Sequence, residues 1–393
     1  MSNLVGKYIK GDQVIWGVII FLSLISLLTV YSATGSLAYK TQGGNTTYFM
    51  FKQMGFLLFG IFLIVIVHRV PYRYFILFSL PLLYFSIIML VITILSGQNL
   101  NEASRWLSVP GIGVSFQPSE MAKLALIIYV ARVLAQHQRD DGPTLGAFWP
   151  VIIHTGIVCL LIFPENLSTS ILVAGVVMMM MFLGRVPFRN LFFTGLIGIA
   201  IISLVLTLAL NDIVLVDRAE TWAMRVEHYL DEDEAITDYG RDYQITQSKI
   251  AIATGGVLGK GPGNSDQRNF LPHPYSDFIF AIIAEEFGFF GAFLVLVAYF
   301  FLLGRIGVLV RSSNRTFPAF MVLGLGLLLI TQAFLNMGVA VGIFPVTGQP
   351  LPLVSMGGTS ILFTCLAFGA ILSVSRHNQE ERQRMMPGPN TGE

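Results

Sequence analysis

The sequence predicts an all-α polytopic membrane protein with ten transmembrane helices, and three observations lead to that class. The 393 residues are 54% hydrophobic and only 12% charged, whereas soluble domains carry about 25% charged residues. Apolar stretches close to the roughly 20 residues that cross a bilayer recur along the chain. Lys and Arg gather in alternate connections. The charge balance of 24 basic against 23 acidic residues excludes a surface for polyanions such as nucleic acid.

The ten candidate spans follow from local hydropathy. They lack the alternation of period two that is typical of an outer-membrane β-barrel. The fifth and sixth spans are short and are separated only by Pro164–Leu167, which predicts a tight helical hairpin. The spans are residues 14–33, 49–67, 74–95, 117–135, 148–163, 168–184, 190–210, 278–303, 317–342 and 358–375.

The distribution of basic residues predicts the orientation of the helices. The short connections on one side hold only Lys40, Lys52 and Arg105. By the positive-inside rule, the opposite side, which carries both termini, is cytoplasmic. An even number of spans, such as ten, satisfies this arrangement. The fourteen basic residues on the cytoplasmic side are Lys7, Lys10, Arg69, Arg73, Arg132, Arg139, Arg185, Arg189, Arg305, Arg311, Arg315, Arg376, Arg382 and Arg384.

One transmembrane domain is expected over residues 1–393, ending in a short cytoplasmic tail at 376–393. One connection is much longer than the others. Residues 211–277, between the seventh and eighth helices, form an extracytoplasmic loop of 67 residues that holds 12 acidic and 6 basic residues. A loop of this length inside a compact domain is usually either functional or disordered.

This long loop contains one amphipathic stretch. Trp222, Val226, Tyr229 and Leu230 fall on one helical face, which predicts a helix lying on the membrane surface. The acidic run at 231–234 is interpreted as a solvated stretch rather than as a metal site. The loop is therefore expected to be partly ordered.

Two ionisable residues stand at the start of the fourth span. Glu120 and Lys123 follow Pro118, a residue type that suits the first turn of a helix. Their separation of three residues places both side chains on one face, where they can form an ion pair. Charged groups at membrane depth are costly. Either the pair only locks the bundle, or it forms the wall of a cavity in which Lys123 meets an anionic ligand.

A second polar cluster precedes the eighth span. Ser276 or Asp277 would be a natural N-cap of that helix, and capping alone would explain an acid there. The alternative is that Asp277 faces a cavity. From helix geometry, Glu285 would lie about 12 Å below Asp277 and about 80° around the axis. Glu285 is then expected to share the cavity, with Glu286 on the opposite side.

Two glycine-rich stretches belong to the same outer side. Gly255–Ser265 contains Lys260 but lacks the spacing of a phosphate-binding P-loop. Its glycines permit backbone N–H groups to converge on an anion. Thr347–Ser360 joins the last two spans. Two flexible loops and an acid therefore converge at one face of the membrane.

Together these stretches resemble the SEDS family of bacterial cell-wall proteins (shape, elongation, division and sporulation). The resemblance covers essentially the whole chain, and the family's topology agrees with ten spans. The order and spacing of the motifs argue against chance. The motifs are Arg105–Trp106, Gln117–Glu120 with Lys123, Ala251–Gly263, Leu271–Phe278 with Glu285–Gly288, Asn336 and Pro345–Ser360.

The resemblance implies a peptidoglycan glycosyltransferase that polymerises lipid II at the outer face of the bacterial cytoplasmic membrane. It also implies a class B penicillin-binding protein as partner, expected to dock on the eighth and ninth helices, together with other divisome membrane proteins. The general look of the chain favours a division-type (FtsW-like) member over an elongation-type (RodA-like) one. Two rival functions stay open: a lipid II flippase, and a non-catalytic divisome scaffold.

The resemblance assigns roles to individual residues. Asp277 matches the proposed catalytic acid of the family, here a general base for a sugar hydroxyl, and direct displacement predicts inversion at the anomeric carbon. The leaving pyrophosphate requires positive charge from Arg and Lys side chains or from a divalent cation, Mg²⁺ or Mn²⁺. No residue spacing specifies a metal site. The substrate-binding set comprises Arg105, Trp106, Glu120, Lys123, Lys260, Arg268 and Ser355.

Several positions depart from the family pattern, and two of them bear on the assigned roles. Tyr275 stands two residues before Asp277, where family members often carry His. Glu165 lies in the hairpin between the fifth and sixth spans, where an Asp is usual. The resemblance therefore does not support an obligatory His–Asp relay, and it leaves the role of Glu165 open.

Overall fold

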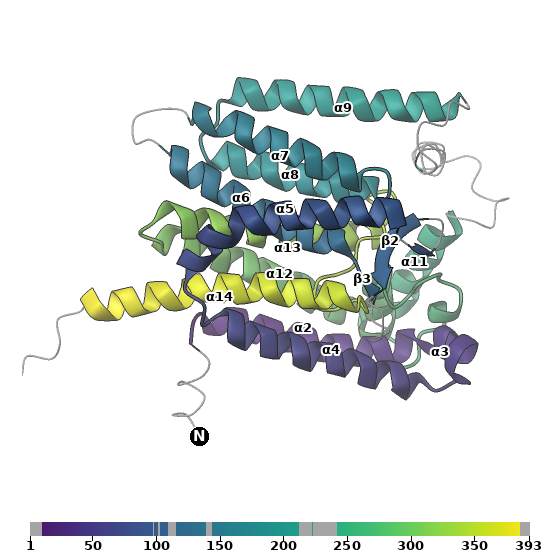
Figure 1. Ribbon diagram of the computed structural model, residues 1–393. Helices are drawn as coiled ribbons and strands as arrows, with labels where there is room; N and C mark the ends of the chain where they lie inside the picture. Colours follow the sequence, from purple (N-terminus) through teal and green to yellow (C-terminus); the bar gives the residue numbers. More distant parts are fainter. Residues whose placement is uncertain are drawn as a thin grey trace, which may run out of the picture.

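The computed structural model describes residues 10–96, 98–100, 103–108, 115–138, 144–211, 222 and 242–385. Figure 1 shows these parts of the chain as a bundle of long helices packed side by side. Two short 3₁₀ turns, Leu145–Ala147 and Gln267–Asn269, accompany them. The helices are α2 (Gln13–Ala33), α3 (Gly35–Gln42), α4 (Thr46–Val67), α5 (Tyr72–Ser96), α6 (Pro118–His137), α7 (Phe148–Ile162), α8 (Leu167–Leu183), α9 (Phe188–Leu210), α11 (Asp242–Gly255), α12 (Ile279–Ser312), α13 (Thr316–Ala340) and α14 (Thr359–Met385).

The predicted class, a helical polytopic membrane protein, is confirmed. Eight of the described helices are long and apolar enough to cross a membrane, and α8 is a shorter apolar helix. Each predicted span lies on a helix of the structure, the fourth of them on α6. The sequence of α6 is less apolar because Glu120, Lys123 and Arg132 fall within its 20 residues. The count of ten crossings stays a prediction.

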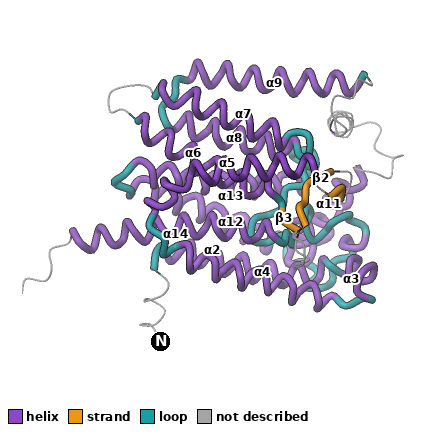
Figure 2. The backbone as a smooth tube through the Cα atoms, viewed as in Figure 1, coloured by secondary structure: helices purple, strands orange, loops and turns teal. Residues whose placement is uncertain are grey.

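One connection of the helical bundle contains short strands that were not predicted from the sequence. Three short strands, β1 (Gln98–Leu100), β2 (Ala103–Ser108) and β3 (Ser115–Phe116), form an antiparallel sheet in the order β1-β2-β3, drawn in orange in Figure 2. Backbone groups in a connection between helices need hydrogen-bond partners, and neighbouring extended segments supply them. Strands of two to six residues are too short to produce a recognisable alternation in the sequence.

The hairpin predicted between the fifth and sixth spans is present. The side chain of Asn166 caps α8 by accepting the N–H of Thr169 at 3.1 Å. The Ser170 hydroxyl donates to the carbonyl of Cys159 on α7 at 3.1 Å. A side-chain cap directly after α7 allows the chain to reverse within a few residues.

The predicted span 278–303 is shorter than the helix that contains it. α12 continues to Ser312 and has 34 residues with a break at Gly288; the part after the break, residues 289–312, is about 36 Å long, whereas the hydrocarbon core is about 30 Å thick. Near the end of α12, the Arg305 Nε donates to Asp12 Oδ2 at 2.8 Å. This polar contact supports the part of α12 beyond the apolar segment. A prediction from hydropathy misses it, because hydropathy does not register contacts between polar side chains.

The last helix also extends beyond its predicted span, 358–375. α14 reaches Met385, so that the predicted tail at 376–393 begins as helix. Arg376 Nε donates to Glu380 Oε1, one helical turn further on, at 2.8 Å. Such i,i+4 pairs support a helix in water.

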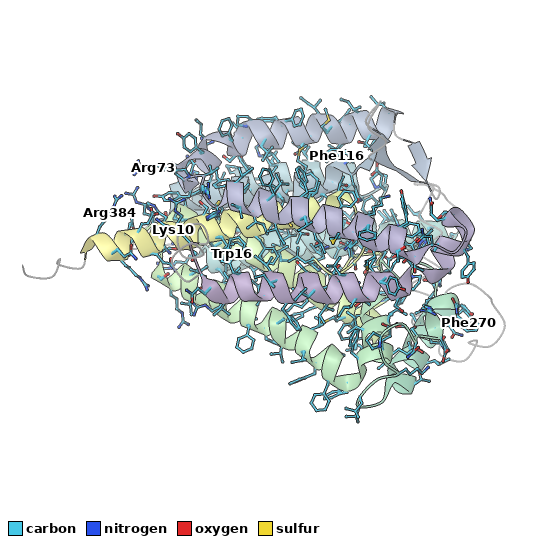
Figure 3. The ribbon with its side chains drawn as sticks, turned by 90° about the horizontal axis from the view of Figure 1, so that it is seen from below. Lys10, Trp16, Arg73, Phe116, Phe270 and Arg384 are labelled. Carbon is cyan, nitrogen blue, oxygen red and sulfur yellow. The ribbon has the colours of Figure 1, made fainter. Side chains whose placement is uncertain are left out.

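The two ends of the bundle differ in composition. In Figure 1, the start of α2 and the end of α14 lie at one end, and α3, α11 and the small sheet lie at the other. Figure 3 places Lys10, Arg73 and Arg384 at the first end and Phe270 at the second. Helix ends rich in Lys and Arg therefore gather on one side of the bundle.

Apolar residues form both the core and the outer surface of the bundle. α9 lies at the edge, beside α8 (Figure 1), and exposes Phe192, Leu196 and Leu204. α6 and α13 lie inside the bundle, with most of their residues buried. Large exposed apolar side chains along whole helices are expected where lipid replaces water as the solvent.

Candidate active site

Asp277 lies in the segment that leads into α12 and is half-buried. Its carboxylate Oδ1 accepts a hydrogen bond from the Ser276 hydroxyl at 2.8 Å. On the other side, a Cβ atom added to Gly348 would lie 3.5 Å from Oδ2. Gly348 has a φ of +64°, a backbone conformation that disfavours side chains. A side chain at position 348 would thus have a strained backbone and would begin in van der Waals contact with the carboxylate.

Capping does not account for the acid at this position. The N-cap of α12 is Phe278, and no side chain caps the helix. The alternative in which Ser276 or Asp277 caps the eighth span is therefore wrong. The first helical carbonyl belongs to Phe278, which accepts from Ala281 N at 3.0 Å.

The backbone around Asp277 is held at three consecutive carbonyl groups. The carbonyl of Tyr275 accepts from Met356 N at 2.9 Å, and that of Ser276 accepts from the Ser355 hydroxyl at 2.6 Å. The carbonyl of Asp277 itself accepts from Asn336 Nδ2 at 2.9 Å. Hydrogen bonds at each successive carbonyl leave this short segment little freedom. The carboxylate is consequently presented from a rigid support.

The loop between α13 and α14 supplies two of these three donors and is itself buried. Residues 349–355 enter the bundle as irregular backbone, with Leu353 at a φ of +64°. Irregular backbone is tolerated there only where protein groups satisfy it. Side chains of α2, α12 and α13 supply those groups. The pairs are Asn336 to Gln349 O (2.8 Å), Gln332 to Pro350 O (3.0 Å), Tyr299 to Pro352 O (2.6 Å) and Ser26 to Val354 O (2.8 Å).

A second cluster forms where the first glycine-rich stretch meets α12. α12 is broken at Gly288, which has φ +67° and ψ −166°. The carbonyls of Glu285 and Glu286 accept from Lys260 N (3.0 Å) and Gly261 N (2.9 Å) instead of from α12. The loop thus replaces helical hydrogen bonds at the break.

Close approach at this break requires glycine on both sides. A Cβ on Gly288 would lie 2.4 Å from Gly259 N, and one on Gly259 would lie 2.2 Å from the carbonyl oxygen of Glu286. A Cβ on Gly255 would lie 2.0 Å from Ala284 O. The predicted role of these glycines was to gather N–H groups around an anion. In the structure, two N–H groups of this loop, those of Lys260 and Gly261, donate to α12 instead.

The Glu285 carboxylate is buried within this second cluster. Its Oε1 accepts from Lys260 Nζ at 2.6 Å and from Asp266 N at 3.1 Å, and its Oε2 accepts from the Ser265 hydroxyl and from Gln267 N at 3.3 Å. Full burial of a carboxylate requires donors of this kind. The prediction that Glu285 shares a cavity with Asp277 is therefore wrong, since its carboxylate binds the glycine-rich loop.

Lys260 contacts two carboxylates of the chain itself. Its ammonium lies 2.9 Å from Asp266 Oδ2 as well as 2.6 Å from Glu285 Oε1. Hydrogen bonds to these two carboxylates raise the pKa of Lys260 above its usual value. The hydrogen bond from Lys260 lowers the pKa of Asp266. In the structure, Lys260 therefore fastens its loop to α12.

Arg268 connects the same loop to α2. One of its terminal nitrogens donates to the Ser32 hydroxyl at 3.1 Å and to Gly263 O at 2.8 Å. The Ser32 hydroxyl in turn donates to the buried Glu286 carboxylate. Glu286 thus contacts α2 through Ser32, while Glu285 is bound by the loop; the placement of Glu286 opposite Asp277 stays a prediction.

The ion pair predicted on the fourth span is present on α6. Lys123 Nζ lies 2.7 Å from Glu120 Oε1, and both side chains are buried. Among the described contacts, none joins this pair to Asp277. Arg105 and Trp106 lie on β2, but their side chains fall outside the described residues.

The expected surface helix in the long loop is described only at Trp222. That residue is buried, with its ring 5.1 Å from the ring of Phe163. Val226, Tyr229 and Leu230 lie outside the described residues, as does the acidic run at 231–234. Within the described ranges, no group of three His, Cys, Asp or Glu side chains could hold a metal ion.

No role was assigned from the sequence to Asn336 or Gln349, two residues that the structure places at this site. Asn336 entered only as a matching position, and Gln349 as part of a glycine-rich stretch. The available signal for Asn336 was a buried amide within an apolar helix, which is costly unless it is hydrogen-bonded.

Tyr275 lies beside the acid. Burial, and to a lesser extent the negative charge of Asp277, raises the pKa of the Tyr275 hydroxyl. Tyr275 therefore stays protonated at neutral pH.

The sequence and fold match known proteins over nearly the whole chain. A family model for FtsW, RodA and SpoVE, described as "Cell cycle protein", matches residues 12–380. The probable peptidoglycan glycosyltransferase FtsW of Halomonas elongata is 32% identical over 379 residues, covering 95% of this chain and 92% of the relative. The peptidoglycan glycosyltransferase MrdB of Escherichia coli is 35% identical over 389 residues, covering 96% and 98%.

Solved structures agree with the sequence matches. A chain from a structure described as "Structural coordination of polymerization and crosslinking by a peptidoglycan synthase complex" is similar with a TM-score of 0.72 and 27% identity, covering 94% of this chain and 98% of its own. RodA of Thermus thermophilus shares the fold with a TM-score of 0.67 at 23% identity, covering 95% and 99%. This chain belongs to the FtsW/RodA/SpoVE family of cell cycle proteins.

Proposed function

We propose that Asp277 is the general base of this multi-pass membrane enzyme, a peptidoglycan glycosyltransferase that polymerises lipid II. The observation that carries the proposal is the half-buried carboxylate, whose Oδ1 is fixed by Ser276 and whose supporting backbone is hydrogen-bonded at three successive carbonyls. A general base acts efficiently only when it is positioned within hydrogen-bond reach of the proton that it removes.

In the proposed reaction, Asp277 takes the proton of an acceptor sugar hydroxyl. The hydroxyl oxygen bonds to the anomeric carbon of the donor, and the bond from that carbon to the lipid pyrophosphate breaks. The pyrophosphate leaves with the electron pair. A single displacement inverts the anomeric centre. Proton removal by a positioned base contributes about 10²–10⁴-fold to such a rate.

Positive side chains are proposed to stabilise the departing pyrophosphate. Arg105, Lys123, Lys260 and Arg268 are the candidates, with Arg suited to a bidentate grip. Lys260 and Lys123 would have to exchange their present carboxylate partners for the ligand. A divalent cation, Mg²⁺ or Mn²⁺, would supply the same charge.

The other residues proposed to contact the substrate are Trp106, Glu120 and Ser355, and they have different surroundings in the structure. Trp106 lies beside Arg105 on β2, and Glu120 holds Lys123. The hydroxyl of Ser355 already bonds to Ser276 O and to Leu351 N. We therefore assign Ser355 to the support of the acid more than to direct substrate contact.

The placement in the membrane is proposed from the two ends of the bundle. Ten spans, cytoplasmic termini and an extracytoplasmic loop at 211–277 agree with Lys10, Arg73 and Arg384 gathering at one end and with α11 lying at the other (Figures 1 and 3). The whole chain then acts as a single domain, and Asp277 faces the outer side.

A class B penicillin-binding protein is proposed as the partner on α12 and α13. The similar chain at 27% identity comes from a peptidoglycan synthase complex. α12 offers exposed aromatic side chains at Phe289, Phe290 and Phe293, with the first and third rings stacked at 5.7 Å. A division-type role within the divisome remains the proposal, although relatives named FtsW and MrdB are similarly close.

A polymerisation assay on purified protein tests the proposal. Lipid II is supplied with and without the cognate penicillin-binding protein, and glycan products are resolved on gels. Asp277→Asn should fold and bind its partner, yet lose about 10²–10⁴-fold in rate. Glu381→Gln, which removes an acid at the opposite end of the bundle, should retain the full rate.

Other outcomes point to the rival functions. Normal polymerisation by Asp277→Asn would remove the residue from the role of base. Translocation of lipid II in liposomes without any polymerisation by the native protein would favour a flippase. Absence of both activities, with partner binding intact, would favour a scaffold.

A further inference from the structure

Asn336 occupies a buried position on α13 with only 1% of its surface exposed. Both hydrogen bonds donated by its amide nitrogen go to main-chain carbonyls. One is the carbonyl of Asp277 at 2.9 Å, and the other is the carbonyl of Gln349 at 2.8 Å. An amide NH₂ has two protons, so both are used in joining these two segments.

The two joined segments come from distant parts of the chain. Asp277 precedes α12, whereas Gln349 belongs to the buried loop after α13. The side chain of Gln349 continues the connection, because its Nε2 donates to the Thr169 hydroxyl on α8 at 2.6 Å. Asn336 therefore lies at the centre of a buried polar network that extends from α8 to the acid.

The three hydrogen bonds that support the acid are not equivalent. Those to the carbonyls of Tyr275 and Ser276 come from the loop itself, through Met356 and Ser355. The third, to the carbonyl of Asp277, comes from Asn336 on α13, outside the loop. Loss of that side chain would weaken the hold on the peptide group next to the carboxylate, while the flanking contacts keep the loop in place.

We propose that Asn336 is a positioning residue for the glycosyl transfer, which clamps the peptide of Asp277 against the loop after α13. The inference rests on the proposed role of Asp277 as base. A displacement of about 1 Å in a catalytic group can cost on the order of 10²-fold in rate. Substrate binding depends on other residues, so the clamp should affect kcat and leave KM unchanged.

The test compares two similar substitutions on one helix. Asn336→Leu removes the clamp and preserves the approximate volume. Gln332→Met, one turn earlier, removes a buried amide that donates to Pro350 O at 3.0 Å and makes no described contact with Asp277. Both variants are purified with the penicillin-binding protein partner, and kcat, KM and the unfolding temperature are measured on lipid II.

The expected result is a kcat lowered by about 10²-fold for Asn336→Leu, with KM within twofold of the native value. Gln332→Met should keep kcat within about threefold at a similar unfolding temperature. If Asn336→Leu is poorly folded, Asn336→Ser, which cannot reach both carbonyls, replaces it. Failure of both Asn336 variants to fold would overturn the inference, since the residue would then be purely structural.

Two further outcomes also overturn the inference. One is a native kcat in folded Asn336→Leu, and the other is an equal loss of kcat in Gln332→Met. Asp277→Asn in the same assay separates the two proposals. If Asp277→Asn is active, the base assignment fails; if it is inactive while Asn336→Leu is fully active, only the clamp fails.

Discussion

At the scale of single residues, the buried acids are distinguished by their donors. Glu285 is fully buried and accepts from Lys260, Ser265 and two backbone N–H groups. Glu285 therefore stabilises the fold by pairing with these donors. Its removal would leave the Lys260 ammonium without its buried partner, and breaking a buried ion pair is costly. Asp277, in contrast, is half-buried, and its Oδ1 accepts from the Ser276 hydroxyl. The more deeply buried acid is thus the one that holds the loop, and the half-buried acid is the one proposed as the base.

This difference predicts the effect of removing Glu285. Glu285→Ala should lower the free energy of unfolding by about 3–5 kcal/mol, the usual cost of breaking a buried ion pair. Thermal unfolding in detergent measures it. Asp266→Ala is the matched control, because Asp266 also pairs with Lys260 but its side chain is 74% exposed. An equal loss of stability in the two variants would contradict this assignment.

At the scale of elements, the break in α12 and the glycine-rich loop form one unit. Phe289 N donates to Gly256 O at 2.9 Å, and the freed carbonyl of Glu285 accepts from Lys260 N at 3.0 Å. Backbone groups on both sides of the break at Gly288 are thus paired with the loop. The broken helix and the loop are therefore expected to form or fail together.

Gly288→Ala should disrupt this unit. Its φ and ψ lie in a region essentially restricted to glycine, which costs about 1–3 kcal/mol, and the added Cβ would lie 2.4 Å from Gly259 N. We expect a lower unfolding temperature and faster proteolysis of the 255–270 loop. Gly304→Ala, on the same helix with nothing within 4 Å, should be neutral or stabilising. A native-like Gly288→Ala would show that the backbone tolerates a side chain there.

At the scale of the whole molecule, the distribution of charge along the bundle predicts its orientation in the membrane. Lys10, Arg73 and Arg384 lie at one end of the bundle, and Phe270, seven residues before Asp277, lies at the opposite end (Figure 3). Positive residues are retained on the cytoplasmic side of a membrane. In the proposed topology the acid therefore faces the outer side, where the proposed polymer would be made.

Cysteine accessibility in intact cells tests this direction. Phe270→Cys and Arg384→Cys are made separately after Cys159 and Cys365 are replaced by Ala. A membrane-impermeant maleimide should label Phe270→Cys in intact cells and Arg384→Cys only after lysis. The cysteine-free protein controls for background. Labelling with the opposite sidedness would invert the proposed topology.

The sequence was sufficient for features that depend on neighbouring residues. The mean hydropathy of a segment depends only on its own residues, so transmembrane helices can be predicted without knowing which helices they pack against. The pair of Glu120 and Lys123 follows from a separation of three residues on one helix. Helix ends were predicted less well, because α12 and α14 continue on polar contacts such as Arg305 with Asp12.

Only the tertiary structure decided which polar groups meet across the bundle. Asn336 lies 59 residues from Asp277 along the chain, and no periodicity relates two positions so far apart. The contacts of Glu285 depend likewise on the glycine-rich loop, which packs against α12 at its break. Local sequence fixes local geometry, whereas a hydrogen bond between distant segments exists only after packing has brought their surfaces together.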